Sequence, residues 1–251
     1  MSETTILILG GTAEAVKLAS HLQAPHLRVI SSLAGRTLAP AKIAGEIRVG
    51  GFGGPQGLAD YLKAENVKLL IDATHPFATQ ISDNAIFAST TVNPIAFVRL
   101  ERPAWLKKPG DKWVVVDTLT QAADAIPSKA RVLLALGKQH IATFSKRNSV
   151  HFVVRMIDPP EAPLDLVDFE LELSKPGTVE GEASLLIAKR ITHIVCRNSG
   201  GKASYAKITA ARDLGIPVIM LERPRRPEIR TLPDVESVIG FVRETLNSLG
   251  T

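Results

Sequence analysis

Short runs of β-branched and aliphatic residues alternate with amphipathic helical patterns along almost the whole chain. The first helical pattern begins at Ala15, where Leu18, Ala19 and Leu22 fall on one face of a helix. Strands that alternate with helices in this way are typical of βαβ units, which build parallel sheets. We therefore expect an α/β protein with helices packed on parallel sheets.

The hydrophobic runs predict eleven strands and the periodic segments predict eight helices. Strands are expected at residues 4–9, 27–31, 46–49, 67–73, 94–98, 113–116, 131–136, 151–156, 169–173, 193–196 and 216–221. Helices are expected to begin at Ala15, Pro55, Pro76, Gln121 and Gln139, and to cover residues 179–190, 203–214 and 235–249. Pro76 suits the first position of a helix, because the N–H that proline lacks would have no partner there.

Residues 102–112 interrupt the alternation with Pro103, Pro109 and Gly110 among charged residues. This composition indicates a connection between domains. We therefore predict two Rossmann-like domains, residues 1–108 and 109–251, each with a parallel sheet and with a cleft between them.

The composition of the 251 residues, 45% hydrophobic and 22% charged, is that of a folded globular protein. The longest apolar runs are far shorter than a membrane-spanning helix, and residues 1–10 lack the basic start of a signal peptide. We therefore expect a cytoplasmic protein with no membrane partner. The single cysteine, Cys196, excludes an internal disulfide and a cysteine-cluster metal site, and we predict no metal.

Positive charge is concentrated near the C-terminus. Residues 186–230 contain ten basic and three acidic residues, a net charge of +7 against +5 for the whole chain. Such a segment favours an anionic partner, which could be a nucleic acid, a phosphorylated cofactor or a polycarboxylate. A solvated basic face without a ligand is the alternative.

A glycine turn follows the first predicted strand, where doubly wound folds bind a pyrophosphate on the N–H groups of a helix. The residues of this turn are Gly10, Gly11, Thr12, Ala13 and Glu14. Because Thr12 replaces the second glycine of the G-x-G-x-x-G motif, a simple tight turn is an equal alternative. The second strand ends in Ser31 and Ser32, followed by Arg36, where NAD enzymes usually have an acidic residue. This combination predicts binding of a 2′-phosphate and therefore of NADPH.

Two further segments follow predicted strands at the same sheet edge. Gly50–Gly57 is dense in glycine, which lets backbone approach a ligand closely, and it contains Gly51, Phe52, Gly53 and Gly54. After the fourth strand, Thr74 and His75 are expected to face a ligand, although His75 could instead cap a helix or pack.

The second half of the chain repeats the order of strand, polar glycine turn and helix. The turn contains Arg197, Asn198, Ser199, Gly200, Gly201 and Lys202, which together favour capture of an anion. Tyr205 and Lys207 follow at the start of the helix and could face the ligand, with an exposed helix surface as the alternative for Lys207. Near the predicted connection, Arg102 and Trp105 offer a cation and an aromatic plane, unless Trp105 is simply packed.

Other chemistries lack their motifs. Gly137-Lys138 is followed by Gln139, which argues against a Walker-type ATPase, and neither G-x-S-x-G nor H-E-x-x-H occurs. Only 5% of the residues are aromatic and no nucleic-acid recognition module is apparent, so we expect no nucleic-acid partner.

The ordered set of segments resembles the precorrin-6A reductases of cobalamin (vitamin B12) biosynthesis. The matching segments are ILGGTAEA at 8–15, SLAGRT at 32–37, GGFGG at 50–54, DATHPFA at 72–78, RLERPAW at 99–105, CRNSGGKASYAK at 196–207 and GIPVIMLERP at 215–224. The resemblance implies NADPH-dependent reduction of one carbon–carbon double bond of the macrocycle precorrin-6A, which yields precorrin-6B.

The resemblance also implies roles for the residues above. The dinucleotide is expected at Gly10–Glu14, Ser31, Ser32, Arg36, Gly51, Phe52, Thr74 and His75. The carboxylate-rich substrate is expected at Gly53, Gly54, Arg102, Trp105, Arg197–Lys202 and Tyr205. His75, Tyr205 and Lys207 are the candidate proton donors, with water as a rival. The alternative substrate is a cobalt-containing ring. The alternative functions are a dinucleotide-sensing regulator and a nucleic-acid-binding protein. Neighbouring pathway enzymes are further candidate partners.

Overall fold

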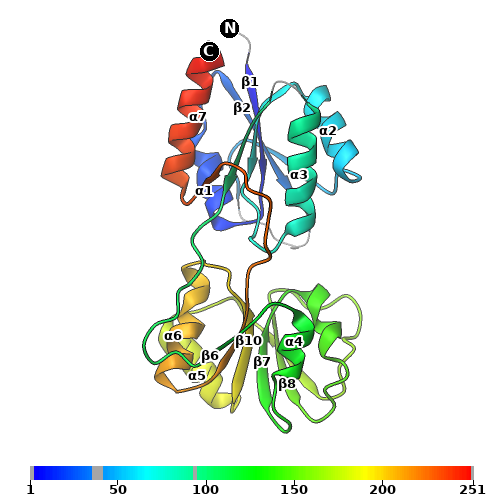
Figure 1. Cartoon of the computed structure of the whole chain (residues 1–251), viewed down its shortest axis with the longest axis vertical. Helices are drawn as coiled ribbons and strands as arrows, with labels where there is room; N and C mark the ends of the chain where they lie inside the picture. The colour runs from blue at the N-terminus through cyan, green and yellow to red at the C-terminus, as the bar shows by residue number, and fades with distance from the viewer. Residues whose placement is uncertain (1–2, 36–41, 93–94, 250–251) are drawn as a thin grey trace. The chain divides into compact units, whose positions relative to one another are not determined.

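The computed structural model describes residues 3–35, 42–92 and 95–249. The chain forms two compact units, of which the first combines Met1–Pro103 with Arg225–Thr251 and the second is Ala104–Pro224. Both are doubly wound α/β units with a parallel six-stranded sheet, which confirms the predicted fold class (Figure 1).

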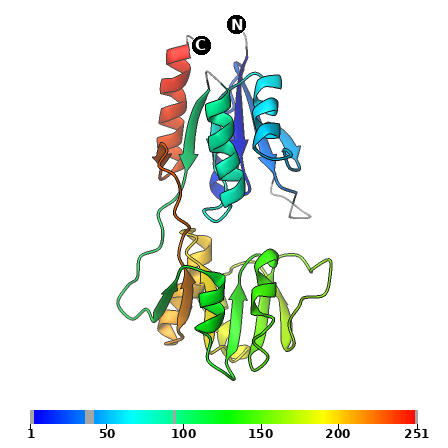
Figure 2. The same cartoon turned by 45° about the vertical axis from the view of Figure 1, so that its right-hand side comes forward.

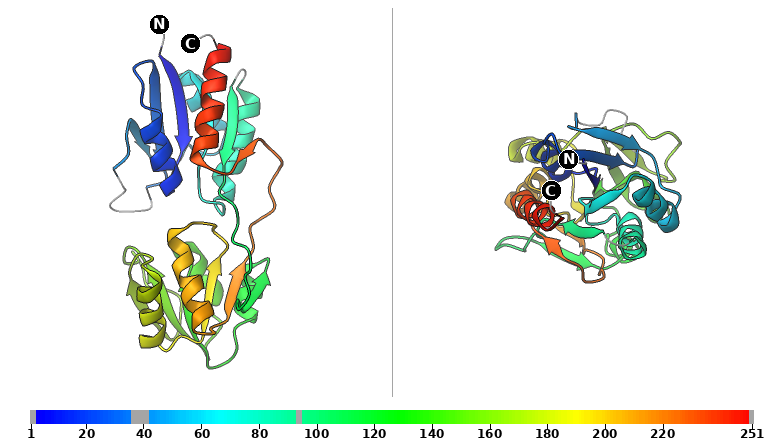
Figure 3. Two further views of the ribbon diagram at one scale, coloured as in Figure 1. Left: turned by 90° about the vertical axis from the view of Figure 1, so that its left-hand side faces the viewer. Right: turned by 90° about the horizontal axis from the view of Figure 1, so that it is seen from above.

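The sheet of the first unit has the strand order β12-β5-β4-β1-β2-β3. Its strands are β1 (Thr4–Leu9), β2 (Leu27–Leu33), β3 (Glu46–Val49), β4 (Val67–Asp72), β5 (Ala96–Leu100) and β12 (Thr231–Leu232). Its helices are α1 (Ala13–His21), α2 (Pro55–Ala64), α3 (Thr79–Thr91) and α7 (Val235–Leu249). Helices lie on both faces of this sheet, as Figures 1 and 3 show.

Alternate residues of the central strands supply two cores. Ile6 and Ile8 of β1 pack in the core that contains Leu18 of α1 and Val238 of α7. Leu7 and Leu9 of the same strand point to the opposite face, where the core contains residues of α2 and α3. Because both faces of this parallel sheet are covered, its central strands can be apolar at almost every position.

The sheet of the second unit has the order β6-β11-β10-β7-β8-β9. Its strands are β6 (Trp113–Val116), β7 (Arg131–Ala135), β8 (His151–Met156), β9 (Phe169–Leu173), β10 (His193–Arg197) and β11 (Val218–Leu221). Its helices are α4 (Leu119–Asp124), α5 (Val179–Ala188) and α6 (Ala206–Asp213), with 3-10 helices η1 (Lys138–Phe144) and η2 (Ala203–Tyr205). Figure 2 shows helices on both faces of this sheet as well.

The last segment of the chain does not belong with residues 109–224. The predicted division assigned all of 109–251 to one domain, whereas Arg225–Thr251 lies in the first unit. There, Arg99 N–H donates to Arg230 O and Glu101 N–H donates to Leu232 O, both at 2.9 Å, which pairs β12 with β5. The apolar face of α7 then completes the core beside α1.

Most predicted elements match the structure closely, with three differences. Helix α3 begins at Thr79, so the prediction that a helix begins at Pro76 is wrong. Residues 75–78 instead form a turn in which Ala78 N–H donates to His75 O at 2.7 Å. The segment after Gln139 is a 3-10 helix, and the two-residue strand β12 was not predicted. None of the helices in the described ranges is long and apolar enough to span a bilayer.

Candidate active site

The turn between β1 and α1 is held by its threonine. Thr12 Oγ1 accepts from Ala15 N–H at 3.1 Å, which caps α1, and donates to Ala73 O at 2.8 Å, which ties the turn to the end of β4. Gly11 has φ +105°, a conformation that favours glycine, and a Cβ there would meet no atom within 4 Å. The turn therefore has an open side next to the N-terminus of a helix.

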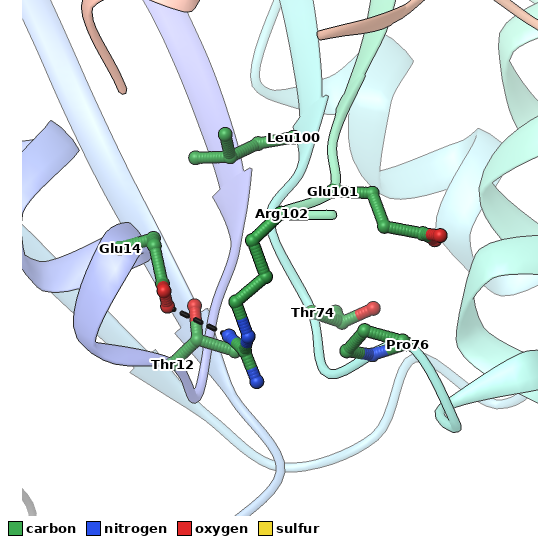
Figure 4. Close-up of a pocket in the computed structure, with 7 residues that line it drawn as sticks. All are labelled: Thr12, Glu14, Thr74, Pro76, Leu100, Glu101 and Arg102. Atoms are coloured by element: carbon green, nitrogen blue, oxygen red, sulfur yellow. Dashed lines mark hydrogen bonds and ion pairs between the residues drawn. The ribbon is translucent and has the colours of Figure 1, made fainter. Parts of the chain in front are cut away.

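A small pocket lies beside this turn (Figure 4). It is lined by Thr12, Glu14, Thr74, Pro76, Leu100, Glu101 and Arg102. Arg102 Nη1 lies 2.8 Å from Glu14 Oε2 in the first turn of α1, and both side chains are largely shielded from solvent. The structure thus brings together predicted residues from three strand ends, and it pairs the predicted substrate residue Arg102 with the predicted cofactor residue Glu14.

The segment after β4 is shaped by a buried carboxylate. Asp72 Oδ1 accepts from Thr74 Oγ1 at 2.6 Å and from Thr74 N–H at 3.1 Å, and Asp72 Oδ2 lies 3.4 Å from Arg99 Nε. His75 Nδ1 accepts from Phe77 N–H at 3.2 Å. In the neutral imidazole the proton is therefore on Nε2, which makes that atom the donor of the ring.

Arg226 is a residue of this site that the sequence did not reveal. It comes from the segment after the second unit, yet its Nη1 donates to Ser82 Oγ at 2.8 Å and its Nη2 donates to Pro76 O. Burial and the neighbouring Arg99 lower the pKa of Arg226. Its partners are 144 and 150 positions away in the chain, so no local pattern could have pointed to it.

The predicted residues of β2 have different surroundings from those expected. Strand β2 continues to Leu33, and Ser31 and Ser32 are 2% and 6% exposed, so both are buried in the sheet. Ser31 Oγ has no hydrogen-bond partner within the described part of the chain. Arg36 lies outside the described residues.

The glycine-rich loop after β3 is organised by Arg48. Its Nη1 donates to Gly50 O at 2.6 Å and its Nη2 to Gly51 O at 2.8 Å. The guanidinium carbon lies 3.8 Å from the ring centroid of Phe52. Gly53 and Gly54 complete the loop with φ +78° and +97°, so glycine is favoured at both positions.

In the second unit, the Asn198 side chain forms hydrogen bonds with the backbone of Trp105. Its Oδ1 accepts from Trp105 N–H at 2.8 Å and its Nδ2 donates to Trp105 O at 3.1 Å, while Arg223 Nε donates to Asn198 O. Asn198 is 3% exposed. The amide is therefore used to hold Trp105, and it is not presented to solvent as a ligand group would be.

Trp105 is 9% exposed, so the alternative that it is packed is correct. Its ring lies edge-on to Tyr205 at 5.6 Å between centroids, and Arg212 Nη2 donates to the Tyr205 hydroxyl at 2.8 Å. Lys207 Nζ lies 5.3 Å from the Trp105 ring centroid.

Lys207 is 6% exposed, and the alternative of an exposed helix surface is wrong. Its ammonium donates to Ser204 O at 2.7 Å, and burial lowers the pKa of this side chain.

The remaining polar turn of the second unit lies at the end of β10. Lys202 is exposed, whereas Arg197, Gly200 and Gly201 are half-buried and Ser199 is 7% exposed. Ser199 N–H donates to Arg197 O at 2.8 Å. A turn with exposed and half-buried cations at a carboxyl strand edge has the chemistry to bind an anion.

Two doubly wound units with parallel six-stranded sheets and polar, glycine-rich turns at their carboxyl strand edges define an α/β protein of the Rossmann-like class. The family "Precorrin-6x reductase CbiJ/CobK" matches residues 5–243. Among curated proteins, the precorrin-6A reductase of Rhodobacter capsulatus is 44% identical over 96% of both chains. That of Rhodococcus erythropolis is 41% identical over 95% of this chain and 97% of its own. A solved structure of CobK precorrin-6A reductase superimposes with a TM-score of 0.91, at 43% identity over 96% of this chain and 97% of its own.

The chain belongs to the precorrin-6x reductase family, whose members are oxidoreductases that act on a carbon–carbon double bond. The resemblance of the ordered motifs is thereby confirmed.

Proposed function

We propose that this protein is a precorrin-6A reductase of cobalamin biosynthesis, which uses NADPH to reduce one double bond of precorrin-6A and yields precorrin-6B. The observation that carries this proposal is similarity over both units at once: 44% identity and a TM-score of 0.91 each extend over 96% of the chain. Both the dinucleotide turns and the basic segment are therefore within the shared region.

The first unit fits a dinucleotide. Added Cβ atoms at Gly11, Gly50 and Gly51 would meet nothing within 4 Å, so the backbone there leaves room for a ligand. The sequence from Ser31 to Arg36, in which β2 ends, contains no acidic residue, which favours NADPH over NADH, with Arg36 as the proposed partner of the 2′-phosphate. The cofactor supplies a hydride, and the protein supplies orientation and charge.

The second unit is the proposed macrocycle unit. Arg197 and Lys202, with the backbone of Ser199, Gly200 and Gly201, provide donors for the carboxylate arms of the substrate. Arg102, Gly53 and Gly54 are further proposed contacts from the first unit. Asn198 and Trp105 act as positioning residues, because the Asn198 amide is already bound to the Trp105 backbone.

We propose His75 as the proton donor, with Tyr205 as the second candidate. The Nδ1 atom of His75 accepts from Phe77 N–H, so the neutral ring carries its proton on Nε2. Lys207 remains the third candidate by chemistry, but its ammonium is buried and donates to Ser204 O, so it is less accessible to a substrate than the other two.

A metal-free substrate is favoured over the cobalt-containing one. Relatives named precorrin-6A reductase are 39–44% identical, whereas a cobalt-precorrin-6A reductase of Priestia megaterium is 28% identical. We further propose that the reaction takes place in the cytoplasm, with neighbouring enzymes of the pathway as partners.

The test is turnover by the purified protein. With precorrin-6A and NADPH we expect oxidation of NADPH and a product whose mass has increased by the mass of two hydrogen atoms. Cobalt-precorrin-6A, NADH and RNA serve as comparisons in the same experiment. Faster turnover of the cobalt ring would support the alternative substrate, and binding of NADPH or RNA without any turnover would contradict the enzymatic proposal.

A further inference from the structure

Gly51 is a glycine that the folded chain does not itself require. Gly50, Gly53 and Gly54 of the same loop have φ of +113°, +78° and +97°, so their backbone conformations account for glycine. Gly51 does not have such a φ, and a Cβ on it would meet no atom within 4 Å. The open space beside Gly51 is therefore available to a molecule outside the chain.

The peptides on either side of Gly51 are oriented by one side chain. Arg48 donates to Gly50 O at 2.6 Å and to Gly51 O at 2.8 Å, which is the fork geometry that a planar guanidinium offers. The same guanidinium lies 3.8 Å from the centroid of Phe52 and 5.1 Å from that of Tyr61. Phe52 packs edge-on against Tyr61, so this stack is anchored on α2.

The planar peptide bond fixes the direction of the N–H groups of Gly51 and Phe52. In a trans peptide the C=O and the following N–H point in opposite directions. Because the carbonyls of Gly50 and Gly51 turn toward Arg48, the N–H groups of Gly51 and Phe52 turn away from it. Within the described residues, neither N–H has a backbone partner. The loop therefore presents two neighbouring donors on the side that faces away from Arg48.

The position of the loop in the sheet indicates which part of a ligand would meet these donors. Arg48 is the register partner of Ser32, and β3 lies beyond β2 as seen from β1. In doubly wound sheets the pyrophosphate binds at the helix after β1 and the adenosine ribose at the end of β2. A loop one strand further out adjoins the adenosine end of the dinucleotide.

We propose that Arg48 is a positioning residue for the dinucleotide: it holds the two peptides so that the N–H groups of Gly51 and Phe52 bind acceptor atoms of the adenosine moiety. This inference rests on the proposed function, because it requires that the protein binds a nicotinamide dinucleotide. Arg48 itself faces the carbonyls and Phe52, so it does not read the 2′-phosphate.

The first experiment measures dissociation constants of NADPH, NADH and 2′,5′-ADP by fluorescence titration for the wild type, Arg48→Met and Arg48→Lys. We expect Arg48→Met to weaken all three nucleotides by one common factor of about ten, since two charge-assisted hydrogen bonds that order the loop are lost. Arg48→Lys should weaken them by a smaller common factor, because its ammonium can still donate to a carbonyl but lacks the planar fork. At saturating NADPH, kcat should change little. Arg28→Met is the matched control, because Arg28 lies on the neighbouring strand β2 but pairs with Glu46 and Glu65.

The outcomes separate the two proposals. If the wild type binds none of these nucleotides, the proposed function fails and this inference fails with it. Normal wild-type binding that is unchanged in both Arg48 variants overturns the inference alone. A loss confined to NADPH and 2′,5′-ADP, with NADH unaffected, would mean that Arg48 reads the 2′-phosphate and would overturn the positioning role.

A second pair of variants is chosen so that neither substitution destabilises the folded protein. Gly51→Ala and Gly240→Ala each add a methyl group where nothing lies within 4 Å, and neither glycine has a positive φ that would strain alanine. Both variants should keep the wild-type Tm or raise it. Gly51→Ala should weaken the three nucleotides severalfold while Gly240→Ala, on α7, leaves them unchanged. Equal nucleotide affinity in the two variants would contradict a ligand beside Gly51.

Discussion

At the residue scale, a side chain that the sequence nominates for ligand binding can have that role or an internal one. His75 Nδ1 accepts from the backbone N–H of Phe77 in its own turn, and Lys207 and Asn198 donate to backbone carbonyls inside the second unit. A cation or amide in a glycine-rich turn is therefore not by itself a ligand group. Its burial and its partners decide which of the two roles it has.

His75→Asn separates the proposed proton donor from its structural surroundings. The Asn oxygen can still accept from Phe77 N–H, so the turn should be preserved. Loss of the donor should lower kcat by about 10² or more, in the range of general acid catalysis. The measurement is steady-state turnover of precorrin-6A together with an NADPH titration. Unchanged kcat would assign protonation to Tyr205 or water.

Lys207→Met tests whether burial of the ammonium costs the folded protein stability. Burial lowers the pKa of Lys207 in the folded state, so the unfolded chain binds the proton more tightly and the wild type gains stability as pH rises from the folded toward the unfolded pKa. The variant should raise the free energy of unfolding near pH 7 by roughly 1 kcal/mol and flatten this alkaline rise. Urea unfolding at several pH values measures both. A large loss of kcat in the variant would restore Lys207 as a proton donor.

At the element scale, caps and turns determine where helices begin and what they leave open. Thr12 caps α1 and also bonds to the end of β4, so one hydroxyl joins two of the strand ends around the pocket. Thr118 caps α4 in the second unit through a capping box with Gln121. These two threonines provide the same type of cap in different surroundings.

Thr12→Val and Thr118→Val should each lower the free energy of unfolding by about 1–2 kcal/mol, because each removes a cap. Only Thr12→Val should also weaken NADPH binding, since only that turn lies at the proposed dinucleotide site. Thermal unfolding and NADPH titration of both variants provide the comparison. An equal effect of the two substitutions on NADPH would argue against a dinucleotide at the β1–α1 turn.

At the scale of the whole molecule, the chain leaves the first unit once and returns to it. Residues 104–224 form one contiguous unit, whereas the first unit is assembled from two distant segments. Helix α7 contributes Val235, Val238 and Val242 to the core beside α1. The first unit without its returning segment would expose that core to water.

Separate expression of residues 104–224 and of residues 1–103 should show that only residues 104–224 fold alone. Residues 104–224 should unfold cooperatively on their own, and residues 1–103 should fail to do so until a peptide of residues 225–251 is added. Burial of the apolar face of α7 is the reason, since burying apolar area is the main favourable contribution to folding. Circular dichroism during heating is the measurement, and cooperative unfolding of residues 1–103 alone would disprove the dependence.

The sequence by itself determined the elements and the fold class. Strands at residues 4–9, 46–49, 113–116, 151–156 and 169–173 match their predicted bounds, because continuous apolar or alternating runs encode burial locally. Glycine turns at strand ends are equally local, so the sequence alone was enough to nominate the candidate site residues. The family resemblance rested on the same short motifs.

Only the tertiary structure decided what depends on partners far apart in the chain. The two-residue strand β12 has no periodicity to detect, and its pairing with β5 places the C-terminal segment in the first unit. Arg226 reaches a turn 150 positions away, and the burial of Lys207 depends on Trp105, which lies outside its own helix. A local pattern records which residues can be buried or turned, but long-range contacts select their partners, and those contacts assign the roles of individual side chains.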